Sequence, residues 1–484
     1  MLEARNVTFS YHGTGPVLDS VDVTLERGEI VILTGPTGSG KSTLSKFLCG
    51  YIPRAIGGEC SGQLLIDGSD VAALSLAEIS RRVALVQQDP ESQLCTLKVS
   101  DEAAFGPENY LVEPGQISRL VESSLSSMGS SHLVDRPTYA LSGGEKQRVV
   151  IASMLACQPD YLILDEPSSS LDPRGVLQLR QTLLDMKRND LGVICIEHDL
   201  NAVRPVADRV LTLSKGKLFS LKPDVSFKSG GLSASSDGPA AYPRKGPIVQ
   251  ASDVSFAYEE KTVIRRVSVA VYSGETVALM GDNGSGKSTL IGLLGGLLNP
   301  LEGEVRLDSV PIRNVPRRDR AKRVGIVFQN PNTQIFEKTV WREYTLTRDV
   351  LRLTDSVDLE PQLRKAGLAD LKNRNPFSLS HGQKRRLNLC SATVHNPELY
   401  LFDEPFTGQD EEGRDFILGI IGRRASTGGA CVVATHDSSF AARYCSRLIF
   451  MENGSILLDG PPRSVLQRLR AIGRSEYSIL EVAS

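Results

Sequence analysis

The sequence lacks several features that would point to particular classes of protein. Its eight cysteines stand singly, without a C-x-x-C pair, and so give no sign of a zinc site, an iron–sulfur cluster or a disulfide framework. No segment approaches the roughly 18 uninterrupted apolar residues of a membrane helix, and residues 1–5 do not have the pattern of an export signal. The 55 basic and 57 acidic residues leave a net charge of −2, so no overall field attracts nucleic acid or anionic lipid. We therefore expect a cytosolic protein that binds no nucleic acid and reaches a membrane only through a partner.

Glycine is plentiful, and it is concentrated in two similar strings. Residues 35–42 read GPTGSGKS between an apolar run and a helix-like segment, and residues 281–288 read GDNGSGKS in the same setting. In such a phosphate-binding loop, backbone N–H groups and a helix N-terminus surround phosphate oxygens, the lysine reaches the β- and γ-phosphates, and the following serine can ligate Mg²⁺. Two chance matches are improbable, so the sequence predicts two sites for a nucleotide with Mg²⁺. The predicted binding residues are Gly35, Pro36, Thr37, Gly38, Ser39, Gly40, Lys41, Ser42 and Thr43, and then Gly281, Asp282, Asn283, Gly284, Ser285, Gly286, Lys287, Ser288 and Thr289.

The spacing of equivalent residues indicates that the chain repeats one domain. Lys287 minus Lys41 is 246 positions, and Asp403 minus Asp165 is 238. Such a nearly constant offset favours two copies of one domain over a solenoid, whose period would be about 20–50 residues. Between the copies, a stretch rich in glycine and serine lacks an apolar period and is predicted to be a flexible linker. The predicted parts are a first domain at 1–220, the linker at 221–247, a second domain at 248–462 and a C-terminal tail at 463–484.

Within each half, short apolar runs alternate with helical patterns, which predicts an α/β domain with a mostly parallel sheet. The runs at 161–164 and 192–196 match those at 399–402 and 430–434, and each is followed by charged residues. In open α/β sheets, ligands bind at the carboxyl ends of the strands. Each half also opens with a stretch of period two, at 7–11 and 254–258, which predicts a small antiparallel β-subdomain.

Two adjacent acids follow a predicted strand in each half, as Asp165-Glu166 and Asp403-Glu404. Neighbouring strand residues point to opposite sides. The first acid can therefore hold Mg²⁺ with the serine of the phosphate loop, while the second polarises an attacking water. Paired acids after strands are also common turn formers, but behind a phosphate loop they favour catalysis.

Between loop and acids in each half lies a third string, LSGGEKQR at 141–148 and LSHGQKRR at 379–386. It resembles the signature of ATP-binding-cassette (ABC) ATPases, and the resemblance covers nearly the whole chain except the linker and the tail. It implies two P-loop ABC ATPase domains in one chain, each with a helical subdomain, that hydrolyse ATP with Mg²⁺. It also implies further site residues: Tyr11 and Tyr258 to stack on adenine, Gln88 and Gln329 to touch Mg²⁺ and the attacking water, His198 and His436 to contact the γ-phosphate, and Ser142, Gly143, Gly144, Ser380 and Gly382 in the signatures.

In that family two domains pair head to tail, and the signature of one completes the ATP site of the other. The resemblance implies a first site of Lys41, Ser42, Gln88, Asp165, Glu166 and His198 with Ser380 and Gly382, and a second of Lys287, Ser288, Gln329, Asp403, Glu404 and His436 with Ser142, Gly143 and Gly144. One departure makes the sites unequal, because His381 replaces the first glycine of the second signature. We expect the site completed by Ser380 to hydrolyse ATP more slowly.

The strings at 88–94 and 101–109 are similar to those of ATPases from energy-coupling factor transporters, which take up vitamins or transition-metal ions. The first string recurs at 329–336, whereas the second is missing from the second half. This resemblance implies a peripheral subunit on the cytoplasmic face of the cell membrane. Its partners would be a transmembrane coupling protein and a membrane substrate-binding protein. The alternatives are the tandem ATPase of a sugar-type importer and a soluble ABC ATPase that takes no part in transport.

Overall fold

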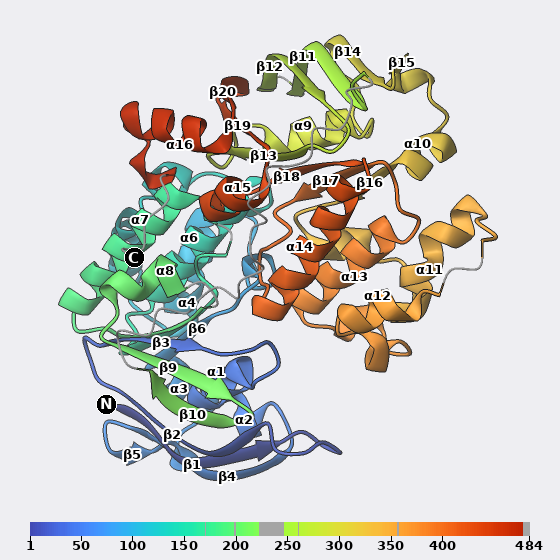
Figure 1. The fold of residues 1–484 in the computed structure, drawn as a ribbon. Helices are drawn as coiled ribbons and strands as arrows, with labels where there is room; N and C mark the ends of the chain where they lie inside the picture. The colour runs from blue at the N-terminus through green and yellow to red at the C-terminus, as the bar shows by residue number, and fades with distance from the viewer. Residues whose placement is uncertain (170, 198–199, 222–245, 260, 356–357, 478–484) are drawn as a thin grey trace. The chain divides into compact units, whose positions relative to one another are not determined.

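The computed structural model describes residues 1–169, 171–197, 200–221, 246–259, 261–355 and 358–477. The chain divides into two compact units, 1–227 and 228–484, each with its own hydrophobic cores. Each unit combines a mostly parallel six-stranded sheet with a four-stranded antiparallel sheet and a group of helices, which confirms the predicted fold class (Figure 1).

The central sheet of the first unit has the strand order β10-β9-β3-β8-β7-β6. The strands from β9 to β6 pair in parallel, and only β10 is antiparallel to its neighbour. The inner strands read as continuous apolar runs because helices cover both faces of a parallel sheet. Their bounds are β3 Ile30–Thr34, β6 Val83–Val86, β7 Tyr161–Asp165, β8 Gly192–Ile196, β9 Arg209–Ser214 and β10 Lys217–Leu221.

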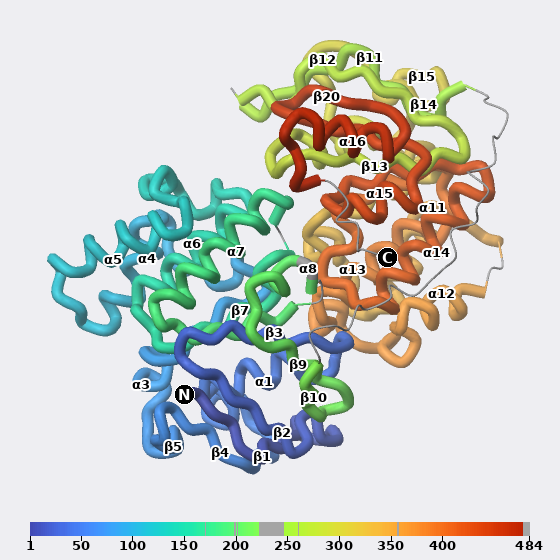
Figure 2. The backbone as a smooth tube through the Cα atoms, turned by 60° about the vertical axis from the view of Figure 1, so that its left-hand side comes forward, coloured from blue at the N-terminus to red at the C-terminus, as the bar shows by residue number. Residues whose placement is uncertain are grey.

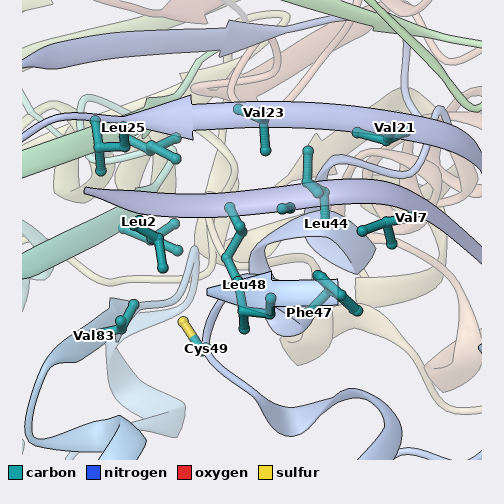
Figure 3. Close-up of a cluster of buried hydrophobic side chains, with 14 of the residues drawn as sticks. Leu2, Val7, Val21, Val23, Leu25, Leu44, Phe47, Leu48, Cys49 and Val83 are labelled. Carbon is teal, nitrogen blue, oxygen red and sulfur yellow. The ribbon is translucent and has the colours of Figure 1, made fainter. Parts of the chain in front are cut away.

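The antiparallel sheet of the first unit has the order β2-β1-β4-β5 and forms the predicted β-subdomain. One face of β1 and β2 packs on the helix that follows the phosphate loop, so that Val21 and Val23 lie over Leu44 and Leu48 (Figure 3). This packing fixes the direction of the helix whose N-terminus faces the nucleotide site. The bounds are β1 Leu2–Ser10, β2 Leu18–Leu25, β4 Glu59–Ile66, β5 Ser69–Asp70 and α1 Lys41–Leu48.

The helical subdomain of the first unit consists of α4, α5 and α6, which lie side by side (Figure 2). Their apolar faces meet the central sheet in one core with Leu125, Val149 and Leu162. The helices of the unit are α2 Tyr51–Arg54, α3 Leu76–Ser80, α4 Val99–Asn109, α5 Pro114–Ser127, α6 Gly143–Ala156, α7 Pro173–Arg188 and α8 Leu200–Val203.

The second unit repeats this plan, with sheets in the orders β16-β17-β18-β13-β19-β20 and β12-β11-β14-β15. Its strands are β11 Val249–Tyr258, β12 Lys261–Val271, β13 Thr276–Gly281, β14 Glu302–Leu307, β15 Val310–Pro311, β16 Val324–Val327, β17 Leu399–Asp403, β18 Ala430–Ala434, β19 Arg447–Glu452 and β20 Ser455–Gly460. Its helices are α9 Lys287–Leu294, α10 Arg317–Arg323, α11 Val340–Leu351, α12 Glu360–Lys365, α13 His381–Thr393, α14 Glu411–Ser426, α15 Ser438–Tyr444 and α16 Pro462–Ala471.

The region that the sequence predicts as a C-terminal tail contains a helix that belongs to the second unit. The α16 helix packs against β19 and β20, and its Val465, Leu466 and Leu469 enter a buried cluster with Met280 of β13 (Figure 1). The packed part of the second domain therefore continues to Tyr477, beyond the predicted boundary at 462.

None of the helices in the described part of the chain is both long enough and apolar enough to cross a bilayer.

Candidate active sites

The first phosphate loop joins β3 to α1 and depends on glycines in a left-handed backbone conformation. Gly38 and Gly40 have φ angles of 81° and 106°, and a Cβ atom on Gly40 would lie 2.8 Å from the carbonyl oxygen of Val17. The Nζ atom of Lys41 donates hydrogen bonds to the carbonyl oxygens of Gly35 and Pro36, at 2.7 and 2.9 Å. These bonds hold the ammonium group across the mouth of the loop, where phosphate oxygens are expected to bind.

The second loop, between β13 and α9, has the same geometry. Gly284 and Gly286 have φ angles of 79° and 102°. The Nζ atom of Lys287 donates to the carbonyl oxygens of Gly281 and Asp282, at 2.8 and 3.0 Å. The two predicted phosphate loops are therefore built alike, although their sequences differ at two positions.

Both loops contain a buried hydroxyl group that fits an anionic ligand. The Oγ atoms of Ser39 and Ser285 are buried and make no hydrogen bond with any part of the chain that the structure describes. A buried polar group normally has a partner, because leaving it unpaired costs about 1–3 kcal/mol. A phosphate group in the loop would supply that partner, so these residues fit a nucleoside triphosphate.

In the first unit, the structure brings the loop serine and both acids together at the carboxyl edge of the central sheet. The Oγ atom of Ser42 donates to Oδ2 of Asp165 at 3.2 Å. The Nε2 atom of Gln88 donates to Oε2 of Glu166 at 2.7 Å. Glu166 has a φ angle of 50°, a left-handed conformation that is uncommon for residues other than glycine, so the extended backbone of β7 ends at Asp165. The structure therefore places Asp165 beside the loop serine and Glu166 beside Gln88, and their roles in metal binding and water activation remain predictions.

The two units bury their acids differently, because Asp403 is buried where Asp165 is partly exposed, whereas Glu404 is partly exposed where Glu166 is buried. Asp403 is 4% exposed, and burial raises its pKa although the Ser288 hydroxyl donates to it. Burial also raises the pKa of Glu404 to about 8, against the opposing effect of Lys287. The Oε1 atom of Glu404 lies 3.3 Å from Nε2 of His436 and makes no hydrogen bond with the described residues. Without nucleotide the carboxyl group is therefore protonated at pH 7, and it must lose this proton before it can accept one from water.

His436 occupies the place that the sequence predicts, beside Glu404 and the second phosphate loop. Its Nε2 atom lies 3.1 Å from Oδ1 of Asn283. Burial and the neighbouring Lys287 lower the pKa of His436 well below its usual 6.5. The ring is therefore neutral at pH 7 and can both donate and accept a proton. The equivalent His198 of the first half lies outside the described residues.

The glutamine loops of the two units are held differently. Gln88 contacts the catalytic carboxylate of its own unit, whereas the Gln329 side chain is exposed and the loop is held through its backbone. The guanidinium group of Arg385, on the fully buried face of α13, donates to the carbonyl oxygens of Phe328, at 2.6 Å, and of Gln329. Burial lowers the pKa of Arg385 to about 10, against the attraction of the two acids.

Gln147 stands at the position of Arg385 in the first unit, and its amide makes no hydrogen bond with the part of the chain described. The difference between Gln147 and Arg385 was not predicted from the sequence. The signal was the change from KQR to KRR within the two signature strings.

Each signature string begins a helix, as its Ser-Gly pattern predicts. The Oγ atom of Ser142 accepts from the backbone N–H of Glu145 at the start of α6, and Ser380 does the same with Gln383 at the start of α13. Both form a reciprocal capping box. The glycines Gly143, Gly144 and Gly382 lie in the first turn of these helices. Pairing of the signatures with the opposite phosphate loops remains a prediction.

The two predicted adenine-stacking tyrosines lie at the ends of the first strands of the β-subdomains. The hydroxyl of Tyr11 is 3.2 Å from Oγ1 of Thr43, and its ring packs edge-on against Phe9 with centroids 4.9 Å apart. Tyr258 packs in the same way against Phe256 and is 51% exposed. These contacts orient both rings, and the stacking of adenine on them remains a prediction.

The residues at each loop also fit Mg²⁺ carried by a nucleotide. Ser42 with Asp165, and Ser288 with Asp403, place a hydroxyl and a carboxylate oxygen side by side. Gln88 and Gln329 lie just beyond the ends of β6 and β16. These are hard oxygen ligands, and Mg²⁺ commonly takes one or two of them together with phosphate oxygens and water. When bound, the ion would neutralise charge on the phosphates. Among the described residues no group of three or more His, Cys, Asp or Glu side chains could hold a metal by itself.

Known proteins are similar to this chain over nearly its whole length. A relative from Methanosarcina mazei, provisionally named an ABC transporter ATP-binding protein, is 33% identical over 100% of this chain and 93% of its own length. A Bacillus subtilis relative, provisionally named HMP/thiamine import ATP-binding protein YkoD, is 30% identical over 97% of this chain and 93% of its own. A chain in a model of ribosome-bound archaeal Pelota and ABCE1 aligns with a TM-score of 0.69 over 96% of this chain and 80% of its own. At 22% identity, this last likeness shows a shared fold alone.

The profile of the ABC transporter family matches residues 18–169 and 264–407. These ranges contain both phosphate loops, both signature strings and both pairs of acids. The site geometry described above occurs within each of them. The chain therefore belongs to the ABC transporter family and carries two fused ABC ATPase domains, which bind and hydrolyse ATP.

Proposed function

We propose that this chain is the ATP-hydrolysing subunit of a membrane uptake transporter of the energy-coupling factor type, which imports a vitamin or a transition-metal ion. The observation that carries the proposal is an acid-lined groove on the helical subdomain of the first unit. It involves the 101–109 string on which the sequence resemblance rests. The provisional name of the Bacillus subtilis relative, an HMP/thiamine import protein, is consistent with vitamin uptake.

The groove lies between α4 and α5 and has a volume of about 980 Å³. Its floor is apolar, and its lining includes four acids but no lysine or arginine. The acids Glu108, Glu113 and Glu122 are exposed, and Leu111 at the rim is 91% exposed. Such a groove is complementary to an amphipathic helix with one apolar and one basic face. A cytoplasmic helix of the transmembrane coupling protein has the chemistry to occupy it.

Exposed hydrophobic side chains beside the glutamine loops support contact with a further protein. Leu97 and Tyr139 are 78% and 74% exposed in the first unit. Phe336 and Phe377 are 74% and 54% exposed in the second unit. Large apolar groups exposed next to one another commonly mark protein interaction sites. The two halves offer different residues there, which suits a membrane partner that contacts each half differently.

In this proposal, ATP closes the two halves on each other, and hydrolysis releases them. Lys41 and Lys287 bind the phosphates, Glu166 and Glu404 act on the attacking water, and each signature serine completes the opposite site. The glutamine loops pass the state of the sites to the membrane partner, because Gln88 contacts Glu166 and the loop also contacts the helical subdomain through Lys146 and Glu91, at 2.9 Å. The protein would be peripheral, on the cytoplasmic face of the membrane.

The first test is to isolate the tagged chain from native membranes in mild detergent and to identify what accompanies it by mass spectrometry. A hydrophobic coupling protein together with a membrane substrate-binding protein is the expected result. A permease pair with an external sugar-binding protein would favour the sugar-type importer instead. Ribosomes, or no membrane protein at all, would contradict the proposal and leave a soluble ABC ATPase.

The groove itself is tested by reversing its charge. Glu113→Lys combined with Glu122→Lys should release the coupling protein, whereas Glu59→Lys, on an exposed strand of the β-subdomain, should leave it bound. Neither change lies in an ATP site, so ATP hydrolysis by the purified chain should persist in both. Equal retention of the coupling protein by both variants would show that the groove is not its binding site.

Uptake is tested by removing both phosphate-binding lysines. Lys41→Ala together with Lys287→Ala should abolish ATP-dependent uptake in proteoliposomes that contain the complete complex, while the chain still assembles with its partners. Uptake that continues in this variant would overturn the proposed coupling to ATP.

A further inference from the structure

A C-terminal segment of the second unit packs directly behind the second phosphate loop. Tyr477 is completely buried, and its ring meets that of Phe450 edge-on with centroids 4.8 Å apart. Phe450 lies on β19, which pairs with β13, the strand that leads into the loop. The segment is therefore anchored in the same core as the strand that delivers the loop (Figures 1 and 2).

From this position two side chains reach one carboxylate of the phosphate loop. The Tyr477 hydroxyl donates to Oδ1 of Asp282 at 2.7 Å, and Nη1 of Arg474 donates to Oδ2 of Asp282 at 2.8 Å. Both oxygens of Asp282 are thus engaged by residues about 190 positions away in the sequence. The backbone carbonyl oxygen of the same residue accepts a hydrogen bond from Nζ of Lys287 at 3.0 Å, so Asp282 links the C-terminal segment to the phosphate-binding lysine.

Arg474 is central to the local charge balance. Its side chain is 11% exposed, and it pairs with Glu452 and lies 3.6 Å from Glu476 as well as contacting Asp282. Without the guanidinium group, three carboxylates would face one another beside a loop that must bind a polyanion. Carboxylates that surround one partly buried side chain repel one another strongly once its positive charge is removed. Arg474 therefore makes an acidic residue tolerable in a phosphate loop.

The first phosphate loop contains no carboxylate that must be neutralised, because Pro36 occupies the position that Asp282 occupies in the second loop. Proline carries no charge and fixes its own backbone. The two loops consequently reach the same geometry by different means. The first relies on a rigid residue, and the second relies on contacts from the C-terminal segment.

We propose that Arg474 and Tyr477 are positioning residues for ATP binding at the second phosphate loop, where they neutralise and hold Asp282. The segment from 472 to 477 acts as a latch that makes ATP affinity at this site dependent on the C-terminal packing. This role concerns the ATP site alone and does not depend on what the transporter imports or whether it binds a membrane partner.

The test uses the full chain with Lys41→Ala, so that the second site dominates binding of a fluorescent ATP analogue with Mg²⁺. Arg474→Gln should weaken this binding roughly tenfold, the lower end of what a hydrogen bond between charged groups contributes. Arg470→Gln is the matched control, because Arg470 is an exposed arginine at the end of α16, four residues before Arg474, and its loss should not change the affinity. Tyr477→Phe removes one hydrogen bond while keeping the ring packed, and should weaken binding by a smaller factor.

Rescue separates the electrostatic role from a merely structural one. Asp282→Asn combined with Arg474→Gln should restore the affinity to within about twofold of the Lys41→Ala parent, because the charge that needed neutralising is gone. The loss in Arg474→Gln should also shrink at high salt, which screens repulsion between charges. The proposal is overturned if Arg474→Gln binds as tightly as the control, or if the double substitution rescues nothing while fluorescence of Trp341 shows a folded second unit.

Discussion

The burial of Glu404 should make the stability of the second unit depend on pH, and Glu404→Gln should remove that dependence. The carboxyl side chain is 13% exposed, and its Oε1 atom makes no hydrogen bond with the described residues. Burial raises the pKa of Glu404 from 4.5 to about 8. In the protein without nucleotide, the folded state therefore keeps this proton across neutral pH, whereas the unfolded chain releases it.

The sign follows from proton linkage. A group whose pKa is raised on folding contributes most stability below its unfolded value, and that contribution is lost as the pH rises through the folded value. For Glu404 the loss runs from pH 4.5 to about 8. At about 1.4 kcal/mol for each pKa unit, it amounts to at most roughly 5 kcal/mol. Because water entering the site reduces the penalty, we expect about 2–4 kcal/mol.

Glutamine has nearly the same shape and no charge, so it avoids the penalty at high pH. The free energy of unfolding of Glu404→Gln, minus that of the unchanged protein, should therefore rise between pH 5 and 8.5 and then level off. The single tryptophan of the chain gives a local reporter, because Trp341 lies on α11 of the second unit and packs against Tyr344, with ring centroids 6.1 Å apart. Its fluorescence during urea unfolding follows this unit and not the first.

Glu166→Gln, at the equivalent position of the first unit, is the matched control. Its carboxylate accepts a hydrogen bond from Gln88 and lies in the other unit, so the tryptophan transition should not respond to it in the same way. A difference for Glu404→Gln that stays flat from pH 5 to 8.5 would refute the reasoning, because the buried carboxyl would then carry no linked proton.

Three other substitutions test the sites themselves. In steady-state ATP hydrolysis, Glu166→Gln should retain more activity than Glu404→Gln if the first site is the slower one, and equal retained rates would count against this asymmetry. Arg385→Gln, which loses the two bonds to the glutamine loop, should lower kcat roughly tenfold with less change in KM for ATP, and an unchanged kcat would show that the loop needs no such support. Gly286→Ala should weaken nucleotide binding at the second loop more than Gly284→Ala. Both glycines have a positive φ, but only a Cβ atom at 286 would meet neighbouring atoms, Cδ1 of Ile264 at 2.7 Å and the carbonyl oxygen of Val263 at 3.1 Å. Similar losses in both variants would point to backbone strain alone.

Local patterns in the sequence were sufficient to predict the fold class and to identify the residues that form the two phosphate loops. The glycine strings impose loop geometry through backbone freedom, so Gly40 and Gly286 could be recognised without knowledge of the rest of the fold. The buried strands were apparent as continuous apolar runs, and β8 and β18 end where the sequence places them. Motifs of this kind act over a few neighbouring residues, which is why the sequence alone reveals them.

Other features depend on residues that are distant in the sequence. The contact of Gln88 with Glu166 spans 78 positions, and the latch on Asp282 spans 192 from Arg474. Nothing in the sequence near 474 indicates a phosphate loop, so the segment was predicted as a tail. Burial likewise decides the pKa of Glu404, because the cost of a charge depends on what surrounds it in three dimensions. The sequence by itself determined which chemical groups serve ATP, since those motifs are local. Only the tertiary structure decided how each group is charged and held, since charge and position are set by packing between distant segments.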